Sequence, residues 1–286
     1  MKRILFVILW PAVILAGTGL AQEYPKEEIP TRQIQAEIEA HHSGVAVWWI
    51  GQNSWLIKSD DFLIGTDLVL EDEEPRLYQA PISAAELAPM LDVSFITHGH
   101  GDHFGRDTSR ILAEESDCAF VMPVNCVKTA GQLGIPLERI RQAVPGQQMR
   151  VEAMEVMPLR AIHGNPKFAV YEKANLQDCG YLFTLGGKKF LQPGDSVLLE
   201  DHLFVGHVDV LFISPTEHNT HIEPSVILIN ELEPGLILPQ HSDTFRVTPE
   251  NRYWTRGYAY EVGRLLSKPL KARYHILEHG ERIIVP

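Results

Sequence analysis

The sequence predicts an α/β fold in which two β-sheets are covered by helices within a single domain. Short apolar, β-branched runs alternate with segments of helical character, and this alternation occurs in both halves of the chain. The 286 residues contain no internal repeat and no low-complexity linker, and 45% of them are hydrophobic. That content is enough for one large domain or two small ones, and the continuous alternation favours one.

The first half begins with antiparallel strands. Residues 45–50, 54–59 and 62–67 are apolar runs separated by short turn-forming segments, which is typical of an antiparallel meander. The elements expected after it are a strand at 91–97, a helix at 108–115, a strand at 119–123, a helix at 125–134 and a strand at 155–162.

The second half repeats this order. Its expected elements are a hairpin with a Gly-Gly turn at 180–195, a strand at 208–215, a helix at 224–233, a strand at 235–241 and a helix at 252–267. A β-rich stretch followed by a βα stretch in each half is the pattern that favours two sheets covered by helices.

The N-terminal residues have the composition of a cleavable secretory signal. Two basic residues precede an apolar run, and small residues follow at Gly19 and Ala21. A membrane anchor is the alternative, but Pro11 interrupts the run, which is shorter than the ~20 apolar residues that a spanning helix needs. We therefore expect a secreted or periplasmic protein without a stable membrane anchor. Its parts would be a signal at 1–21, a polar and poorly packed lead-in at 22–43 and the compact domain at 44–286.

Charge and cysteine content bear on the partners and the compartment. The formal net charge is -12 at pH 7, whereas nucleic-acid affinity depends on Lys and Arg that replace condensed counterions. Nucleic-acid binding is therefore disfavoured, and a small-molecule substrate is expected. Cys118, Cys126 and Cys179 allow at most one disulfide. Cys118 and Cys126 are the plausible partners in an oxidising compartment, although the sequence does not establish the bond.

The segment FITHGHGDHFG, residues 95–105, places four metal-ligand side chains on one loop. His98, His100, Asp102 and His103 lie within six consecutive residues, and the spacers are glycines. Imidazole nitrogen and carboxylate oxygen suit zinc, iron and manganese, and glycine lets the backbone turn tightly enough for both halves of the motif to face one cavity. A histidine-rich surface loop is the alternative, but it would need neither the aspartate at that spacing nor a strand before it.

Further ligand-type residues follow other expected strands. His163 follows the strand at 155–162, Asp195 follows the second strand of the hairpin, and His241 follows the strand at 235–240. Each of them alone is more often structural. Their common placement at strand ends makes the set stronger than its members, because a two-metal site needs roughly six or seven converging ligands.

On these motifs the chain resembles the metallo-β-lactamase superfamily. THGHGDH, a later histidine, PGDS and LPQH carry the resemblance, which covers nearly the whole mature chain. Within the superfamily, GVAVWWIGQNSWLIKSDDFLIGTD, GYLFTLGGKKFLQPGDS and LILPQHSDTF are most similar to the branch that contains L-ascorbate-6-phosphate lactonase. The resemblance implies an αββα four-layer sandwich with two divalent metal ions at one sheet edge. Zinc is favoured, and manganese and iron are the alternatives.

The resemblance also implies the metal ligands. The implied sets are His98, His100 and His163 for one metal and Asp102, His103 and His241 for the second, with Asp195 bridging them. Asp67 matches a buried acidic position that supports the ligand loop in the superfamily and would fix ligand orientation. An aspartate that caps a turn is an equally weighted alternative at that position.

Two features depart from the family pattern or add to it. Gln52 stands where many relatives of this branch have histidine, so a substrate contact there is not assumed. The loop at 214–225 adds His218 and His221, with Glu217 beside them. Either histidine is a candidate oxyanion donor, general acid or extra ligand, although ordinary polar loop residues are slightly favoured.

The expected reaction is hydrolysis. Two cations that share a water lower its pKa from ~15.7 toward ~7, and the metal-bridging hydroxide would attack a lactone or ester carbonyl. Asp102 would orient the hydroxide and pass a proton to the leaving group. The resemblance disfavours a true β-lactamase, because those enzymes do not use a bridging aspartate at the position of Asp195.

Two other functions stay open. One is a phosphodiesterase of the phospholipase D-like kind, and the other is a metal-binding protein without catalysis. The second is less favoured, because the ligands lie at the ends of separate strands and not on one mobile loop. Five aromatic residues either line an apolar pocket for an acyl chain or belong to the core, which is the commoner place for such residues. These are Trp48, Trp49, Trp55, Tyr171 and Trp254.

Overall fold

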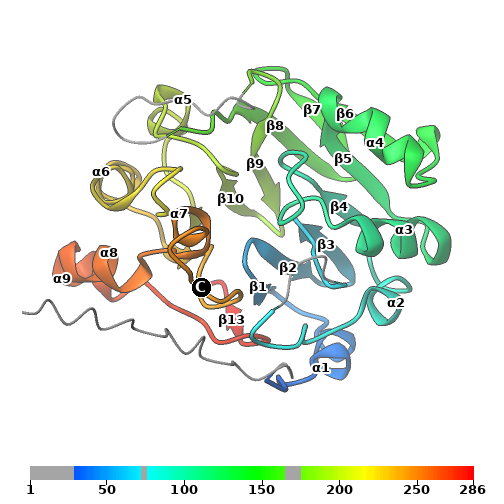
Figure 1. Ribbon diagram of the computed structural model, residues 1–286, viewed down its shortest axis with the longest axis horizontal. Coiled ribbons are helices and arrows are strands. Elements are labelled where there is room, and N and C mark those ends of the chain that lie inside the picture. Colours follow the sequence, from blue (N-terminus) through cyan, green and yellow to red (C-terminus); the bar gives the residue numbers. More distant parts are fainter. Residues whose placement is uncertain (1–28, 72–75, 165–174) are drawn as a thin grey trace, which may run out of the picture.

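The computed structural model describes residues 29–71, 76–164 and 175–286, which Figure 1 shows as a coloured ribbon. The expected signal at 1–21, the beginning of the lead-in and Tyr171 lie outside the described residues. Two β-sheets pack against each other, and helices cover their outer sides. This is the four-layer α/β arrangement that the sequence predicts.

The first sheet contains, among the described residues, seven strands in the order β13-β1-β2-β3-β4-β5-β6. Its antiparallel part consists of β13 (Arg282–Ile284), β1 (Val45–Gly51), β2 (Ser54–Ser59) and β3 (Phe62–Thr66). Its parallel part adds β4 (Val93–Phe95), β5 (Ala119–Pro123) and β6 (Ile140–Ala143). The expected meander is therefore confirmed as β1, β2 and β3.

The second sheet has six strands within the described ranges, in the order β12-β11-β10-β9-β8-β7. They are β7 (Met149–Val151), β8 (Met154–Arg160), β9 (Cys179–Leu185), β10 (Lys188–Gln192), β11 (Val210–Ile213) and β12 (Leu236–Pro239). The expected hairpin is β9 and β10, and both glycines of its turn, Gly186 and Gly187, have positive φ angles that favour glycine.

Both faces of the first sheet are buried. Trp49 of β1 belongs to the core between the sheets, whereas its neighbour Trp48 belongs to the core beneath the outer helices, because successive side chains of a strand point to opposite faces. Phe95 of β4 stacks on Phe183 of β9 across the sheet interface, with ring centroids 5.5 Å apart. Trp48, Trp49 and Trp55 are at most 2% exposed, so these three belong to the core.

The helices form the outer layers. Over the first sheet lie α1 (Gln35–Glu39), α2 (Ala84–Leu87), α3 (Arg106–Glu115), η1 (Val124–Cys126), α4 (Val127–Gln132) and η2 (Leu137–Arg139). Over the second lie α5 (Glu200–Leu203), α6 (Ile222–Leu232), α8 (Ala259–Leu265) and α9 (Lys268–Lys271). The short helix α7 (Arg252–Thr255) lies nearer the middle of the molecule, with its Trp254 carbonyl 2.6 Å from His241 Nδ1. None of the helices in the described part of the chain has the length and apolar character that crossing a membrane requires.

The prediction of one continuous helix over 252–267 is wrong. The chain leaves the helix after Thr255 and enters α8 only at Ala259, with Tyr258 in the left-handed region at φ 43°. A Cβ at Gly257 would lie 2.7 Å from the carbonyl oxygens of both Gln240 and His241. Close approach to the end of β12 therefore replaces the helical turn that local sequence favours.

The expectation of a poorly packed lead-in is wrong for its described part. Ile34 and Ile38 are fully buried in the core beneath the outer helices. Lys58 of β2 also donates a hydrogen bond from Nζ to the Ile38 carbonyl at 2.7 Å. Two isoleucines four residues apart lie on one face of a helical turn, so even a short polar segment can pack. The compact domain thus begins before Gly44.

All three cysteines are buried free thiols, so Cys118 and Cys126 are not bonded. Cys118 precedes the five-residue strand β5 and Cys126 follows it. A strand rises ~3.3 Å per residue, whereas a disulfide needs Cα atoms within ~7 Å. Burial raises the pKa of the Cys126 thiol to about 12, which makes it unreactive at neutral pH.

Candidate metal centre

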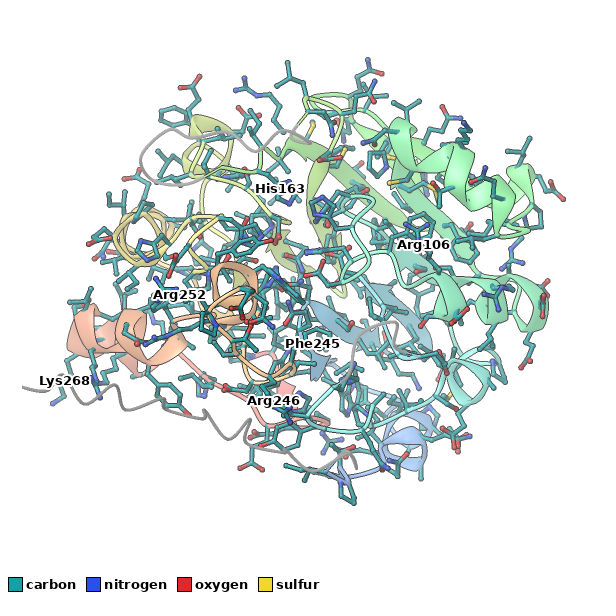
Figure 2. The ribbon with its side chains drawn as sticks, viewed as in Figure 1. Arg106, His163, Phe245, Arg246, Arg252 and Lys268 are labelled. Atoms are coloured by element: carbon teal, nitrogen blue, oxygen red, sulfur yellow. The ribbon has the colours of Figure 1, made fainter. Side chains whose placement is uncertain are left out.

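The seven expected ligands follow four strands, β4, β8, β10 and β12, and the fold brings them together. All seven belong to overlapping groups of three whose candidate ligand atoms lie within 4.8 Å of one another. Figure 2 labels His163 near the middle of the molecule, between the outer helical layers. Strand ends hold these side chains, so the positions of the ligands are set by the sheets.

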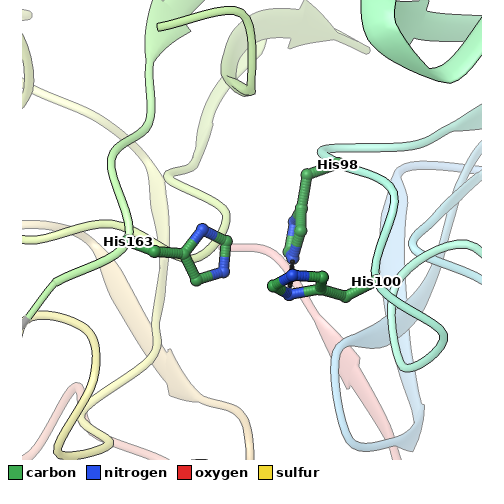
Figure 3. Close-up of side chains that lie close together, drawn as sticks. All are labelled: His98, His100 and His163. Atoms are coloured by element: carbon green, nitrogen blue, oxygen red, sulfur yellow. Dashed lines mark hydrogen bonds between the residues drawn. The ribbon is translucent and has the colours of Figure 1, made fainter. Parts of the chain in front are cut away.

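One group consists of His98, His100 and His163. The ring centroids of His98 and His163 are 4.5 Å apart, and those of His100 and His163 are 4.7 Å apart. His98 Nε2 lies 3.0 Å from His100 Nδ1. Figure 3 shows that His98 and His100 come from one loop and that His163 faces them from a separate segment.

A second group consists of Asp102, His103 and His241. Asp195 lies between the two groups. Its carboxylate oxygens are 2.8 Å from His241 Nε2 and 3.3 Å from His103 Nε2 in the second group. The same carboxylate is 3.5 Å from His163 Nε2 in the first group. Asp195 therefore has the central position that a bridging ligand would need.

Asp67 fixes the orientation of the ligand loop. Its carboxylate accepts hydrogen bonds from the Thr97 backbone nitrogen at 2.7 Å and from Thr97 Oγ1 at 2.8 Å. His103 Nδ1 lies 2.8 Å from Asp67 Oδ2. Both side chains are fully buried, so His103 donates Nδ1–H to Asp67 and turns Nε2 toward the centre. Of the two alternatives for Asp67, the supporting role is the one seen.

The inward-facing nitrogens show that the centre fits cations. When the His103 ring is neutral, donation of Nδ1–H to Asp67 leaves the lone pair on Nε2. His241 Nδ1 lies 2.6 Å from the Trp254 carbonyl and donates to it, so its Nε2 also presents a lone pair. Both lone pairs face Asp195 oxygens at 3.3 Å or less. Acceptors repel at such distances unless a proton or cation lies between them, and imidazole and carboxylate are ligands for divalent metals.

The charges of the ligands differ between the two groups. Burial lowers the pKa of His103, but the carboxylates of Asp195, Asp67 and Asp102 outweigh burial and hold it well above its ordinary value, so a cation at this ring would displace a proton. Burial lowers the pKa of His98 well below its ordinary value, and the pKa of His100, whose ring is only partly covered, is lowered to about 4, chiefly by loss of contact with water. Both rings are therefore neutral at neutral pH, which is the form that binds metal. Burial raises the pKa of Asp195, but the surrounding imidazoles, led by His241, outweigh burial and hold the pKa well below its ordinary value. Asp195 is therefore an anion.

The two loop histidines have different positions. His218 belongs to the centre, because its Nε2 lies 2.9 Å from Asp195 Oδ2 and its Nδ1 lies 2.8 Å from the Tyr253 carbonyl. His221 packs edge-on against the Tyr258 ring at 5.3 Å and belongs to none of the metal-type groups of the described residues. The Glu217 carboxylate accepts a hydrogen bond from the Tyr258 hydroxyl.

Two further polar residues lie at the centre that the sequence analysis did not identify as site residues. Asp178 lies 3.9 Å from His163 Nδ1 and accepts a hydrogen bond from Asn125 at 2.8 Å. Asn53 Nδ2 lies 2.9 Å from both His103 Nε2 and His241 Nε2. In the sequence, Asp178 is marked only by its position just before β9, and Asn53 only by the Gly-Gln-Asn turn at the end of β1. Both signals are too common to identify a functional residue.

The centre reaches solvent on one side. The Asp195 side chain is 1% exposed, whereas that of Asp102 is 17% exposed, and His100 is also exposed. Gln52 Nε2 donates a hydrogen bond to Asp102 Oδ2 at 3.2 Å. A substrate would therefore approach over His100 and Asp102.

Paired sheets with histidines and aspartates at their strand ends define a metallo-hydrolase fold class. The sequence profile of the beta-lactamase superfamily domain matches residues 46–241. Because that match covers more than half of the chain, the protein belongs to the beta-lactamase superfamily.

Curated relatives and a solved structure agree with this assignment. A protein named UPF0173 metal-dependent hydrolase from Anoxybacillus flavithermus is 26% identical over 79% of this chain and 95% of its own length. An uncharacterised Mycobacterium tuberculosis protein is 26% identical over 72% of this chain, and the match spans only 61% of its length. The structure of Igni18, a metallo hydrolase from Ignicoccus hospitalis, is similar in fold, with a TM-score of 0.61 and 18% identity over 84% of this chain and 97% of its own. The name of the Anoxybacillus flavithermus relative supports a metal-dependent hydrolase, and the similarity to Igni18 supports the fold.

Proposed function

We propose that this protein hydrolyses lactones or esters with the help of two divalent cations. The position of Asp195 between His163 on one side and His103 and His241 on the other is the observation that carries the proposal. A centre for one cation would need no shared carboxylate. A histidine-rich surface loop would not bury His98 and His103 to 2% exposure or less.

Hydrolysis needs a nucleophile and a polarised carbonyl. When bound, two divalent cations supply a hydroxide-level nucleophile at neutral pH and polarise the carbonyl oxygen of the substrate. Zinc is the favoured cation, with manganese and iron as alternatives. The protein's own contribution is to place these groups and to move the proton.

Asp102 is the residue proposed to move the proton. It lies on the solvent side of the centre, and Gln52 Nε2 holds its Oδ2 at 3.2 Å. A carboxylate held in this way can orient the attacking water and pass its proton to the leaving alkoxide. His218 Nε2 lies 2.9 Å from Asp195 Oδ2, and its Nδ1 lies 2.8 Å from the Tyr253 carbonyl. Its proposed role is to position Asp195.

The proposed substrate class rests on the resemblance of three sequence segments to the lactonase branch. The segments that carry it, residues 44–67, 180–196 and 236–245, include the strand ends that hold Asp67, Asp195 and His241. A small molecule is the proposed substrate, and the net charge of -12 disfavours nucleic acid. The signal-like composition of residues 1–21 supports a secreted or periplasmic location.

The test is turnover by the metal-loaded protein, residues 22–286, on two chromogenic panels, one of lactones and esters and one of bis-aryl phosphodiesters. We expect metal-dependent cleavage of the first panel and its loss in His98→Ala. His207→Ala removes an exposed histidine and should keep wild-type turnover. Cleavage of phosphodiesters alone would contradict the lactone or ester assignment, and no turnover on either panel with both cations bound would contradict hydrolysis.

A further inference from the structure

Asn53 has an unusual place at the centre. It lies in the turn between β1 and β2 and is fully buried. Its Nδ2 lies 2.9 Å from His103 Nε2 and 2.9 Å from His241 Nε2, the two nitrogens that the second group turns inward. Its Oδ1 is buried without a hydrogen-bond partner. An unpaired buried amide oxygen is costly, at roughly 1–3 kcal/mol.

The spacing of these atoms matches a shared coordination sphere. Ligand atoms bound at ~2.1 Å and at right angles lie ~3.0 Å apart, whereas a tetrahedral arrangement separates them by ~3.4 Å. The amide atom of Asn53 stands 2.9 Å from each of two ligand nitrogens. That distance is the length of an ordinary hydrogen bond, and it also equals the separation of neighbouring corners of an octahedron around one cation.

The amide can present either of its atoms to this position. A half-turn of the side-chain amide exchanges Nδ2 and Oδ1 in space. With Nδ2 inward, the amide donates to the bare nitrogens of His103 and His241. With Oδ1 inward, it offers an oxygen to a cation that the same two nitrogens bind, and the unpaired oxygen gains a partner. A cation would repel the NH₂ group and attract the carbonyl oxygen.

We propose that Asn53 is a ligand of the second cation through Oδ1. This inference rests on the two-cation centre of the proposed function. The second position would then have three oxygen donors beside two imidazoles, whereas the first has three imidazoles and one shared carboxylate. Five protein ligands, three of which are oxygens, favour manganese or iron(II) over zinc at the second position, and the nitrogen-rich first position favours zinc. The chain would therefore hold two different kinds of cation site.

The test uses three side chains of nearly equal size at position 53. Metal-free wild-type protein, Asn53→Leu and Asn53→Asp are titrated with Mn²⁺ and with Zn²⁺ in a calorimeter, and bound metal is counted after dialysis. In Asn53→Leu we expect one tightly held cation and at least ~10-fold weaker binding of Mn²⁺ at the second position, the lower end of the loss seen for altered metal shells. In Asn53→Asp, a charged oxygen takes the same place, so second-site binding should become tighter. With Co²⁺ in the second position, the weak visible absorption of a six-coordinate ion should rise in Asn53→Leu.

The outcomes separate this inference from the proposed function. If Asn53→Leu binds two cations as tightly as wild type, or more tightly, Asn53 is no ligand, while the two-cation centre stands. If Asn53→Leu does not fold, unchanged or weaker second-site binding in Asn53→Asp overturns the inference. If wild type never takes up a second cation at saturating Mn²⁺ or Zn²⁺, the two-cation function and the role of Asn53 both fail.

Discussion

At the scale of single residues, the centre depends on which nitrogen each histidine turns inward. His103 and His241 both donate Nδ1–H to an outer acceptor, Asp67 Oδ2 in one case and the Trp254 carbonyl in the other. Their Nε2 atoms consequently meet at Asp195. The outer partners select the tautomer, and the tautomer determines whether a lone pair is available for a cation.

This dependence can be tested at Asp67. In Asp67→Asn, an NH₂ group can face His103 Nδ1–H, so the ring loses the acceptor that fixes its tautomer. We expect binding of the second cation to weaken by ~10- to 100-fold in a calorimetric titration. Asp61→Asn is the matched control. Asp61 is an exposed carboxylate that pairs with a histidine, His42, outside the metal centre. Equal affinity in Asp67→Asn and wild type would contradict the supporting role.

At the scale of elements, the break between α7 and α8 places the backbone against the metal centre. Gly257 lies against the carbonyl oxygens of Gln240 and His241 at the end of β12. The helix is interrupted between α7 and α8 because a residue with a Cβ could not approach those carbonyl oxygens so closely. The Trp254 carbonyl at the end of α7 also receives the His241 hydrogen bond.

Gly257→Ala tests this packing. The added Cβ would stand 2.7 Å from two carbonyl oxygens, so we expect the free energy of unfolding to fall by ~1–3 kcal/mol in urea denaturation. Gly131→Ala is the control, because Gly131 lies in α4 and a Cβ there meets nothing within 4 Å. That variant should gain ~0.5–1 kcal/mol from helix propensity. The account of the break fails if Gly257→Ala is as stable as wild type.

The short helix α5 gives the fold a pH dependence outside the metal centre. His202 is fully buried there, and burial lowers its pKa to about 4. The unfolded chain has a histidine pKa near ~6.5, so the folded chain binds fewer protons between these values. The free energy of unfolding therefore decreases as the pH falls from ~6.5 toward ~4, by up to ~3 kcal/mol for this group.

Urea titrations of His202→Leu at several pH values check this contribution. As the pH falls from ~6.5 toward ~4, the free energy of unfolding should decrease less in His202→Leu than in wild type. His207→Ala, which changes an exposed histidine close by, should follow the wild-type curve. A constant difference between His202→Leu and wild type would exclude His202 as a source of the pH dependence.

At the scale of the whole molecule, strongly patterned segments were predictable and tertiary contacts were not. The alternation and turns at 45–67 predicted the meander, and the strand-end positions of His98, His163, Asp195 and His241 predicted where the ligands converge. The strands β6, β7 and β13 have three or four residues each, too few to show a period.

Other features depend on contacts that no local pattern encodes. Gly257 breaks a helix because of β12, and Ile34 and Ile38 are ordered by a core built from distant segments. His218 and His221 are three residues apart in one loop, and only the fold places the first at Asp195 and the second at Tyr258.

The central claim, a shared centre for two cations, is tested most directly by the metal content of purified protein that has met no chelator. Elemental analysis should give two divalent cations per chain in wild type and in His207→Ala. It should give fewer than two in Asp195→Ala, because the shared carboxylate is removed. Two cations retained by Asp195→Ala would contradict its bridging position, and an absence of bound metal in wild type would contradict the account as a whole.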